Sequence, residues 1–554
     1  MMEQSAHTDT FCADNLPPRD LWPVMNCDSL PDLAYLSRLN CAAELLDWAV
    51  ESGIGDSPVF HYEEFTWSYS DLMATANRIA HVLVDDLGVE PGNRVLLRAA
   101  NTPMLAACWF AVLKAGAVVV ATMPLLRPRE ICYTAEKARI SLALTDSRVA
   151  EDCERGMLTD LDGHPRPGAR VVHFNSGAPD GLEAMMRGKP ATFRNCNTSA
   201  DDIALVAFTS GTTGRAKGTM HTHRDVLAIT DCFARHILKP DSSDVFCGSP
   251  PLAFTYALGA LLLFPMRFGA STLMLEHASP AQLVRAIHEH RPTVCFTAPT
   301  AYRAMLGMLE EFDVSSLRKC VSAGETLPAA TLEAWHAATG VKIIDGIGAT
   351  EMLHIFISAA GDDIRPGATG RPIPGYEARV VGEDGEELPP GEVGLLQVRG
   401  PTGCRYLDDA ERQKQYVRDG WNLTGDAYMM DDDGYFWYQA RSDDMIVSSG
   451  YNIAAPEVEN ALLSHAAVRE CAVIGVPDAE RGHIVKAFVV LCPEARDDRP
   501  AIKTLQDHVK AEIAPYKYPR SIEFVDELPR TDTGKLQRFR LRESHREPQR
   551  ESHT

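Results

Sequence analysis

Along the first several hundred residues, hydrophobic positions follow two patterns: helical spacing and short continuous runs. The stretch "WSYSDLMATANRIAHVLVDDL" has apolar residues at helical spacing, which predicts a helix that starts near Ser70 or Asp71. The runs "NRVLLRAA" and "ISLALTD" are short, apolar and bounded by turn residues, as expected of buried strands. The stretch "PAQLVRAIHEHRPTVCFTAPTAYRAML" indicates a helix, a strand and a second helix. This alternation predicts parallel sheets covered by helices.

After about residue 370 the pattern changes. The stretch "YEARVVGEDGEELPPGEVGLLQVRG" alternates and contains turn dipeptides, which predicts hairpins of an antiparallel sheet. The C-terminal part predicts a helix over 455–464, strands over 469–476 and 484–491, a helix over 501–513 and a short strand near Ile522. Because these elements form a small α+β unit, we expect one domain over 1–442, a second over 443–545 and a disordered polar tail over 546–554.

Composition narrows the class of protein. A chain of 554 residues corresponds to roughly three to four domain-sized units, and 45% hydrophobic residues allow large cores. The formal net charge of -22 argues against a nucleic-acid partner, because a negative field repels phosphate backbones. The 14 cysteines are scattered without close metal-binding pairs, which indicates a reducing compartment and no disulfide framework.

The chain shows neither a signal-peptide pattern nor a membrane-span pattern. Its start, "MMEQSAHTDTFCADNLPPRD", is polar and lacks a basic segment followed by an apolar one. The most apolar stretch, 105–126, is interrupted by Lys114, so we expect a buried helix, a turn at Gly116 and a core strand. These features predict a soluble, cytoplasmic protein without a membrane partner.

The stretch "FTSGTTGRAKGT", 208–219, combines glycines, hydroxyl side chains and two cations. An apolar run precedes it and a helical pattern begins near His223, which predicts strand, loop and helix around a bound anion. The Walker spacing fails because Gly218 follows Lys217, and in "GIGATE" Glu351 replaces the third glycine of a dinucleotide motif. The alternative is a surface turn, but a loop directly after a buried strand favours phosphate binding.

The segment "TSGTTGRAKG" resembles the signature loop of the adenylate-forming superfamily of acyl- and aryl-CoA ligases, synthetase adenylation domains and luciferases. Four further segments and the final "LPRTDTGKLQR" follow in the order of that family: "SAGE" (322–325), "DGIGATE" (345–351), "TGD" (424–426) and "RSDD" (441–444). The resemblance implies an α/β fold. It would have a large N-terminal domain of stacked α/β sheets plus a small β-barrel-like sheet, and a small mobile α+β C-terminal domain.

The resemblance also implies a reaction in which a carboxylate attacks the α-phosphorus of ATP and the adenylate then reacts with coenzyme A. Catalytic roles fall on Lys535, Glu351 and Thr350, with Glu351 and Thr213 near Mg²⁺ and Lys535 against the charge that develops at the α-phosphate. The implied ATP and AMP residues are Thr209, Ser210, Gly211, Thr212, Thr213, Gly214, Lys217, Ser322, Ala323, Gly324, Glu325, Asp345, Gly346, Ile347, Gly348, Asp426 and Arg441. Taken singly, Asp426 also suits an ordinary turn and Lys535 a solvated loop.

In the family the C-terminal unit rotates between the two half-reactions. The resemblance places the hinge at Asp443 and the coenzyme A side at Gly450 and Tyr451. Two positions depart from the family pattern: Ala440 replaces a glycine, and Val447 stands where many members have lysine. We expect these departures to leave adenylate formation intact and to bear on the conformation used in the second half-reaction.

The acid substrate is predicted to be a small aromatic carboxylate. Residues expected to line its pocket are Phe254, Thr255, Tyr256, Phe264, Gly348, His354 and Ile355. Thr255 replaces the aspartate with which amino-acid-activating relatives grip an α-ammonium group. The segments "DGIGATEMLHIF" and "KYPRSIEFVDELPRTDTGKLQR" resemble benzoate-CoA ligases, and "AHTDTFCADNLPPRDLWP" resembles their 2-aminobenzoate (anthranilate) branch. His354 either orients the acid or an ortho substituent, or packs as pocket wall.

Three functions remain open from the sequence. The first is an aryl-CoA ligase for 2-aminobenzoate or benzoate. The second is an enzyme that delivers the aryl adenylate to the thiol of a separate carrier protein. The third is an inactive nucleotide-binding module, against which the presence of both Glu351 and Lys535 argues. The sequence leaves open whether the protein is a monomer or a homodimer.

Overall fold

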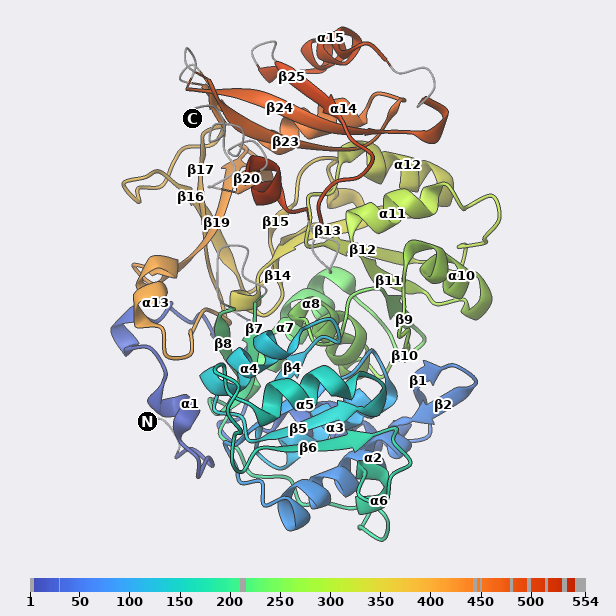
Figure 1. Cartoon of the computed structure of the whole chain (residues 1–554), viewed down its shortest axis with the longest axis vertical. Helices are drawn as coiled ribbons and strands as arrows, with labels where there is room; N and C mark the ends of the chain where they lie inside the picture. The colour runs from blue at the N-terminus through green and yellow to red at the C-terminus, as the bar shows by residue number, and fades with distance from the viewer. Residues whose placement is uncertain are drawn as a thin grey trace, which may run out of the picture.

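The computed structural model describes residues 4–28, 30–209, 216–441, 446–448, 451–478, 482–495, 500–513, 517–530 and 536–543. In this part of the chain the strands form four sheets, and helices cover the first two (Figure 1). The first sheet lies at the lower end of Figure 1, and the C-terminal strands lie at the opposite end, beside α11 (Pro299–Leu306) and α12 (Ala329–Thr339). The second sheet lies between these two ends.

The first sheet is parallel except at one edge. Its order is β6 (Arg170–Phe174), β5 (Leu142–Asp146), β3 (Arg94–Arg98), β4 (Val118–Thr122), β7 (Ile203–Phe208) and β8 (Gly218–Thr222). Only the last pair, β7 with β8, is antiparallel. β3, β5 and β8 are buried along their whole length, and each combines apolar residues with buried polar ones such as Arg98, Asp146 and His221.

The second sheet has a parallel centre with antiparallel edges. Its order is β15 (Arg371–Pro372), β14 (Ile355–Ser358), β13 (Ile343–Gly348), β12 (Lys319–Ala323), β11 (Val294–Thr297), β9 (Val245–Gly248), β10 (Ser271–Leu273), β1 (Pro58–Tyr62) and β2 (Phe65–Ser68). The candidate site lies at the carboxyl ends of β12 and β13.

The two remaining sheets follow in sequence. The third is antiparallel and contains β16 (Glu377–Val381), β17 (Val393–Arg399), β18 (Val417–Arg418), β19 (Trp421–Met430) and β20 (Phe436–Arg441). The C-terminal sheet contains β21 (Ile446–Ser448), β22 (Tyr451–Ile453), β23 (Val468–Asp478), β24 (Gly482–Leu491) and β25 (Ser521–Phe524). Helices α14 (Ala455–Leu463), α15 (Ile502–Glu512) and α16 (Arg538–Glu543) accompany it.

Several helices begin at a residue whose side chain accepts a backbone N–H. The longer helices of the remaining chain are α2 (Tyr69–His81), α3 (Pro103–Lys114), α4 (Pro128–Lys137), α5 (Ala150–Leu158), α7 (His223–Ile229), α10 (Pro280–His290) and α13 (Ala410–Tyr416). Shorter ones are α1 (Phe11–Asp14), α6 (Leu182–Met185), α8 (Thr255–Ala257) and α9 (Phe264–Arg267). α2 begins at Tyr69, which confirms the predicted start near Ser70 or Asp71, and its cap is Ser68, whose hydroxyl accepts from the N–H of Asp71 at 3.1 Å.

The predicted α/β class is confirmed, as are its stacked sheets, its separate antiparallel sheet, its small C-terminal α+β unit and most elements of the chain. The apolar stretch 105–126 folds as α3, a turn in which Gly116 has φ +75°, and β4. All 14 cysteines are free thiols. Among the described residues, no helix has the length and apolar character needed to cross a bilayer. The expected domain boundary at 442/443 lies outside the described residues.

Candidate active site

The glycine-rich loop connects two antiparallel strands. β7 ends at Phe208, β8 begins at Gly218, and the N–H of Thr209 donates to the carbonyl of Lys217 at 2.9 Å. The phosphate-binding candidates of this loop that lie outside the described residues are Ser210, Gly211, Thr212, Thr213 and Gly214.

The expected order of strand, loop and helix is therefore wrong. A whole strand, β8, stands between the loop and α7, because "GTMHT" pairs with β7 as the second arm of a hairpin. At the start of α7 the N–H of Asp225 donates to the hydroxyl of Thr222 at 3.3 Å, and the Asp225 carboxylate accepts from the Thr222 N–H at 3.0 Å. This helix terminus is thus capped internally and cannot serve the loop as the sequence suggested.

Glu351 lies in a tight turn between β13 and β14. The hydroxyl of Tyr406 donates to Glu351 Oε1 at 2.6 Å, and His221 Nε2 donates to the carbonyl of Thr350 at 2.8 Å. Leu353, two residues on, has φ +69°, which reverses the chain into β14. Side chains from β8 and from the segment before α13 therefore fix the turn that carries the two catalytic candidates Glu351 and Thr350.

The buried carboxylate of Asp225 lies next to His221, the residue that bonds to the Glu351 turn. The carboxylate of Asp225 accepts from the guanidinium of Arg405 and lies 3.8 Å from His221 Nδ1. The pKa of Asp225 is held below its ordinary value, because Arg405 and then His221 outweigh the opposing effect of burial. Lys217 Nζ lies over the ring of Tyr406, 5.7 Å from its centre.

The adenine-side candidates lie on neighbouring strands. In β12 and β13, Ser322 is paired with Asp345 and Ala323 with Gly346, and Gly324 follows with φ +89°. Burial raises the pKa of Asp345 to about 7, and the backbone N–H of Gly346 and the hydroxyl of Ser322 oppose this rise. The Ser322 hydroxyl therefore lies close enough to the Asp345 carboxyl to interact with it.

The remaining nucleotide candidates lie on both sides of these strands. Ile347 and Gly348 end β13, and a Cβ on Gly348 would lie 2.7 Å from the carbonyl oxygen of His354. Glu325 is 3.7 Å from Arg530 of the C-terminal unit.

Asp426 and Arg441 occupy paired positions of β19 and β20, as a shared ribose site would require. The N–H of Asp426 donates to the hydroxyl of Thr424 at 3.2 Å, and Asp426 is buried. Burial raises the pKa of Tyr428, and the charges of Asp426 and Asp345 act in the same direction.

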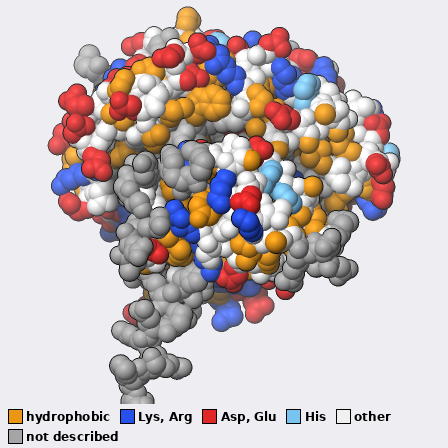
Figure 2. All heavy atoms as spheres, turned by 90° about the horizontal axis from the view of Figure 1, so that it is seen from above, with side chains coloured by type: hydrophobic (Ala, Val, Ile, Leu, Met, Phe, Trp, Pro, Cys, Tyr) orange, Lys and Arg blue, Asp and Glu red, His pale blue; other side chains and the backbone are white. Residues whose placement is uncertain are grey.

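Several C-terminal candidates lie outside the described residues: Lys535, Asp443 and Gly450. Tyr451 begins β22. The C-terminal unit contacts the larger part of the protein through Arg303 of α11, whose guanidinium donates to the carbonyl of Val468 at 3.0 Å. Figure 2 looks onto this end of the molecule, where acidic, basic and apolar side chains alternate over the described surface.

The predicted aryl pocket gathers aromatic rings around His354. The ring of Phe264 packs edge-on against His354 with centroids 4.6 Å apart, and Tyr256 lies 5.7 Å away. Phe233, which the sequence did not single out, lies 5.5 Å from His354. A Cβ on Gly259 would lie 2.5 Å from His354 Cδ2, so glycine is required there. Of the other predicted pocket residues, Phe254 and Thr255 lie at the start of α8, and Ile355 begins β14.

His354 is neutral and has a defined tautomer. Burial lowers its pKa to about 3, so the ring carries no charge at physiological pH. Nε2 lies 3.2 Å from the carbonyl oxygen of Tyr256, and because a carbonyl oxygen only accepts, Nε2 carries the proton. Nδ1 is then an acceptor, buried and without a partner among the described residues. His354 packs as a wall residue and also presents an unsatisfied acceptor.

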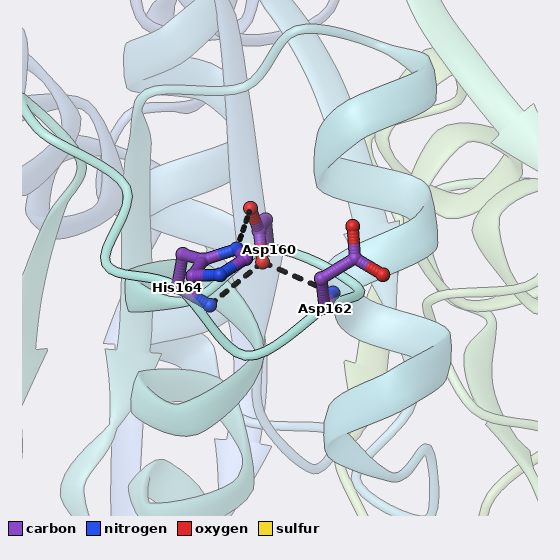
Figure 3. A group of neighbouring side chains, drawn as sticks. All are labelled: Asp160, Asp162 and His164. Atoms are coloured by element: carbon purple, nitrogen blue, oxygen red, sulfur yellow. Dashed lines mark hydrogen bonds and ion pairs between the residues drawn. The ribbon is translucent and has the colours of Figure 1, made fainter.

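One group of possible metal ligands lies away from these residues, in the turn after α5. Asp160 Oδ1 accepts from the backbone N–H of Asp162 at 3.0 Å and of His164 at 2.7 Å, and Oδ2 lies 3.2 Å from His164 Nδ1 (Figure 3). The carboxylate of Asp162 points away from these bonds (Figure 3). Both oxygens of Asp160 serve an Asp-centred turn, which explains the cluster without a metal.

Comparison with known proteins identifies two family matches. The family described as "AMP-binding enzyme" matches residues 46–405, and that described as "AMP-binding enzyme C-terminal domain" matches residues 457–535. The benzoate–CoA ligase of Thauera aromatica is 35% identical over 517 residues, which cover 92% of this chain and 97% of that protein.

Solved structures agree with these matches. The crystal structure of the anthranilate CoA ligase AuaEII in complex with anthranoyl-AMP superposes with a TM-score of 0.86 at 34% identity, covering 93% of this chain and 99% of that one. A benzoate CoA ligase from Burkholderia xenovorans LB400 superposes with a TM-score of 0.81 at 33% identity, covering 91% and 100% of the two chains.

Proposed function

We propose a substrate and a set of residue roles from one premise: the chain belongs to the AMP-binding enzyme family. It is an ATP-dependent, AMP-forming aryl-CoA ligase, whose substrates are an aromatic acid, ATP and coenzyme A. In the first half-reaction the acid's carboxylate oxygen bonds to the α-phosphorus and pyrophosphate leaves. In the second, the thiol sulfur of coenzyme A bonds to the acyl carbon, its proton is lost and AMP leaves.

The aromatic acid proposed is 2-aminobenzoate, and one observation carries this choice. His354 Nδ1 is a buried acceptor without a partner among the described residues. It belongs to a ring surrounded by the aromatic side chains that are predicted to line the pocket. An ortho amino group donates an N–H to such an acceptor, whereas benzoate leaves it unpaired at a desolvation cost. The likeness to the anthranilate CoA ligase AuaEII, solved in complex with anthranoyl-AMP, supports the same choice, and the likeness to benzoate ligases favours the alternative.

A comparison of the two acids tests this proposal. We expect kcat/KM for 2-aminobenzoate to exceed that for benzoate by about tenfold, the value of one hydrogen bond from a buried partner. His354→Phe should abolish this preference, because it keeps an aromatic ring and removes the acceptor. The ratio of the two acids cancels general damage to the variant. Equal or better use of benzoate by the unaltered protein would instead establish benzoate as the substrate.

Glu351 is proposed to hold Mg²⁺ together with Thr213. Its carboxylate receives a neutral hydroxyl donor from Tyr406, and within the described residues it forms no ion pair, so its charge remains for a cation. Mg²⁺ held there would supply positive charge against the departing pyrophosphate. Glu351→Gln should therefore weaken Mn²⁺ binding in the ATP complex, measured by electron paramagnetic resonance.

Lys535 is proposed to stabilise the charge that develops as the carboxylate meets the α-phosphate. Lys535→Ala should slow ATP–pyrophosphate exchange at least about a hundredfold. Its affinity for ATP should stay within about twofold of that of the unaltered protein. Unchanged exchange in this variant would refute the assignment.

A further inference from the structure

Tyr406 lies between two charged groups that are predicted to meet the phosphates of ATP. Its hydroxyl donates to Glu351 Oε1 at 2.6 Å, and the face of its ring is 5.7 Å from Lys217 Nζ. We propose that Tyr406 is a positioning residue that orients the Glu351 carboxylate and keeps Lys217 from pairing with it. This inference rests on the metal role proposed for Glu351.

The backbone ties Tyr406 to the strand that leaves the glycine-rich loop. Tyr406 forms a bridge with Thr219 of β8, and on either side the N–H of Met220 donates to the carbonyl of Arg405 at 2.8 Å and the N–H of Leu407 to that of Gly218 at 2.9 Å. His221, on the same strand, holds the carbonyl of Thr350. One short ladder therefore places the exit of the loop and the Glu351 turn in a fixed relation.

The choice of a tyrosine at this point follows from electrostatics. A carboxylate and an ammonium group within about 4 Å attract strongly in a partly buried site, and a direct pair would remove both charges from the nucleotide. The tyrosine ring holds an ammonium group on its face, and the phenolic hydroxyl fixes a carboxylate without cancelling its charge. In the part of the chain that the structure describes, neither Lys217 nor Glu351 forms an ion pair, as this arrangement requires.

Burial makes the tyrosine a rigid support. Tyr406 is 1% exposed, and the ring of Tyr416 packs edge-on against it with centroids 5.8 Å apart. The hydroxyl is therefore held toward Glu351, and the carboxylate is pre-set before nucleotide and metal arrive.

Two substitutions separate the hydroxyl from the ring. Mn²⁺ is the probe, and its affinity is measured by electron paramagnetic resonance in the ATP complex without aromatic acid, so that no turnover contributes. Tyr406→Phe should weaken Mn²⁺ binding about tenfold and leave metal-free ATP binding unchanged, because only the bond to the carboxylate is lost. Tyr406→Leu should weaken both, because Lys217 then pairs with Glu351.

A second-site change tests the spacer role directly. Adding Lys217→Met to Tyr406→Leu should restore Mn²⁺ affinity to the level of Tyr406→Phe, because the competing ammonium group is gone. Tyr69→Phe is the matched control: it removes a hydroxyl that is equally buried and donates to the carbonyl of Ala270 at 2.7 Å, and it should leave Mn²⁺ affinity unchanged.

Each contrary result has one meaning. Unaltered Mn²⁺ affinity in Tyr406→Phe, or equal losses of Mn²⁺ and metal-free ATP binding, would overturn the positioning role. Failure of Lys217→Met to restore affinity would overturn the spacer role. If Glu351→Gln itself leaves Mn²⁺ affinity unchanged, the proposed metal site fails, whereas a loss in Glu351→Gln without one in Tyr406→Phe refutes only the inference about Tyr406.

Discussion

At the scale of single residues, the buried carboxyl of Asp345 couples stability to pH. Burial raises its pKa from 3.8 to about 7, so the folded protein retains a proton that the unfolded chain releases. Stability contributed by this group should be complete below about pH 4 and fall as pH rises to about 7. Asp345→Asn should remove this component. The melting temperature of the variant, relative to that of the parent, should therefore rise between pH 5 and pH 8.

Thermal unfolding of the nucleotide-free protein checks this expectation. Asp432→Asn, at an exposed position, is the control and should follow the parent at every pH. Parallel curves for Asp345→Asn and the parent would show that Asp345 does not titrate in this range.

Gly259 should control binding of the acid without affecting ATP. A Cβ there would lie 2.5 Å from His354 Cδ2 and 2.9 Å from Phe264 Cζ, so Gly259→Ala must displace packed rings. Overpacking of this kind costs about 1–3 kcal/mol, and a cost of that size in binding corresponds to a rise of about fivefold to 150-fold in KM for the aromatic acid. KM for ATP should stay unchanged. Gly307→Ala, where the nearest atom is 3.8 Å away, should alter neither constant.

The sequence identifies motif residues but not the side chains that position them. Glu351 and Asp345 stand in short segments whose order resembles a family, so local spacing is enough to find them. Tyr406 and His221 reach Glu351 and Thr350 only because β8 pairs with a segment far along the chain. Neither hydrophobic periodicity nor a motif marks such a long-range contact.

At the scale of elements, helices and buried strands were predictable and the hairpin around the loop was not. The stretch 280–306 folds into α10, β11 and α11 as its pattern predicts. β8 has only five residues and is buried throughout, so its side chains do not alternate between apolar and polar. Its identity depends on the backbone of β7, which the local pattern does not contain.

Two capping boxes provide a matched comparison of elements. Ser68 with Asp71 starts α2, and Thr222 with Asp225 starts α7. Replacing either cap by alanine should lower the free energy of unfolding by about 1 kcal/mol, measured by urea denaturation. Only Thr222→Ala should also slow ATP–pyrophosphate exchange, because Asp225 supports His221 behind the Glu351 turn. Equal exchange rates in both variants would show that the α7 cap does not affect the candidate active site.

At the scale of the whole molecule, the sequence predicts the architecture better than the relation between its parts. Alternation of helices and strands indicates the stacked sheets, and turn dipeptides after about residue 370 indicate the antiparallel one. The contacts of the C-terminal unit, such as Arg303 with the carbonyl of Val468, include partly buried hydrogen bonds between polar groups. Polar contacts between surfaces leave no periodic pattern, so their partners emerge only from the folded chain.

Arg303 should act on one half-reaction more than on the other. Its hydrogen bond to Val468 joins α11 to the C-terminal unit, whose sequence includes Lys535, and Lys535 is proposed to act in adenylate formation. Loss of one hydrogen bond worth about 1 kcal/mol should slow ATP–pyrophosphate exchange about fivefold in Arg303→Ala. Transfer from preformed aryl-AMP to coenzyme A should keep its rate, because the resemblance assigns that step to a rotated unit.

Arg291→Ala, which removes an exposed pair with Asp313, is the control and should change neither rate. Equal slowing of both steps by Arg303→Ala would show that the contact supports the fold rather than one conformation of the enzyme.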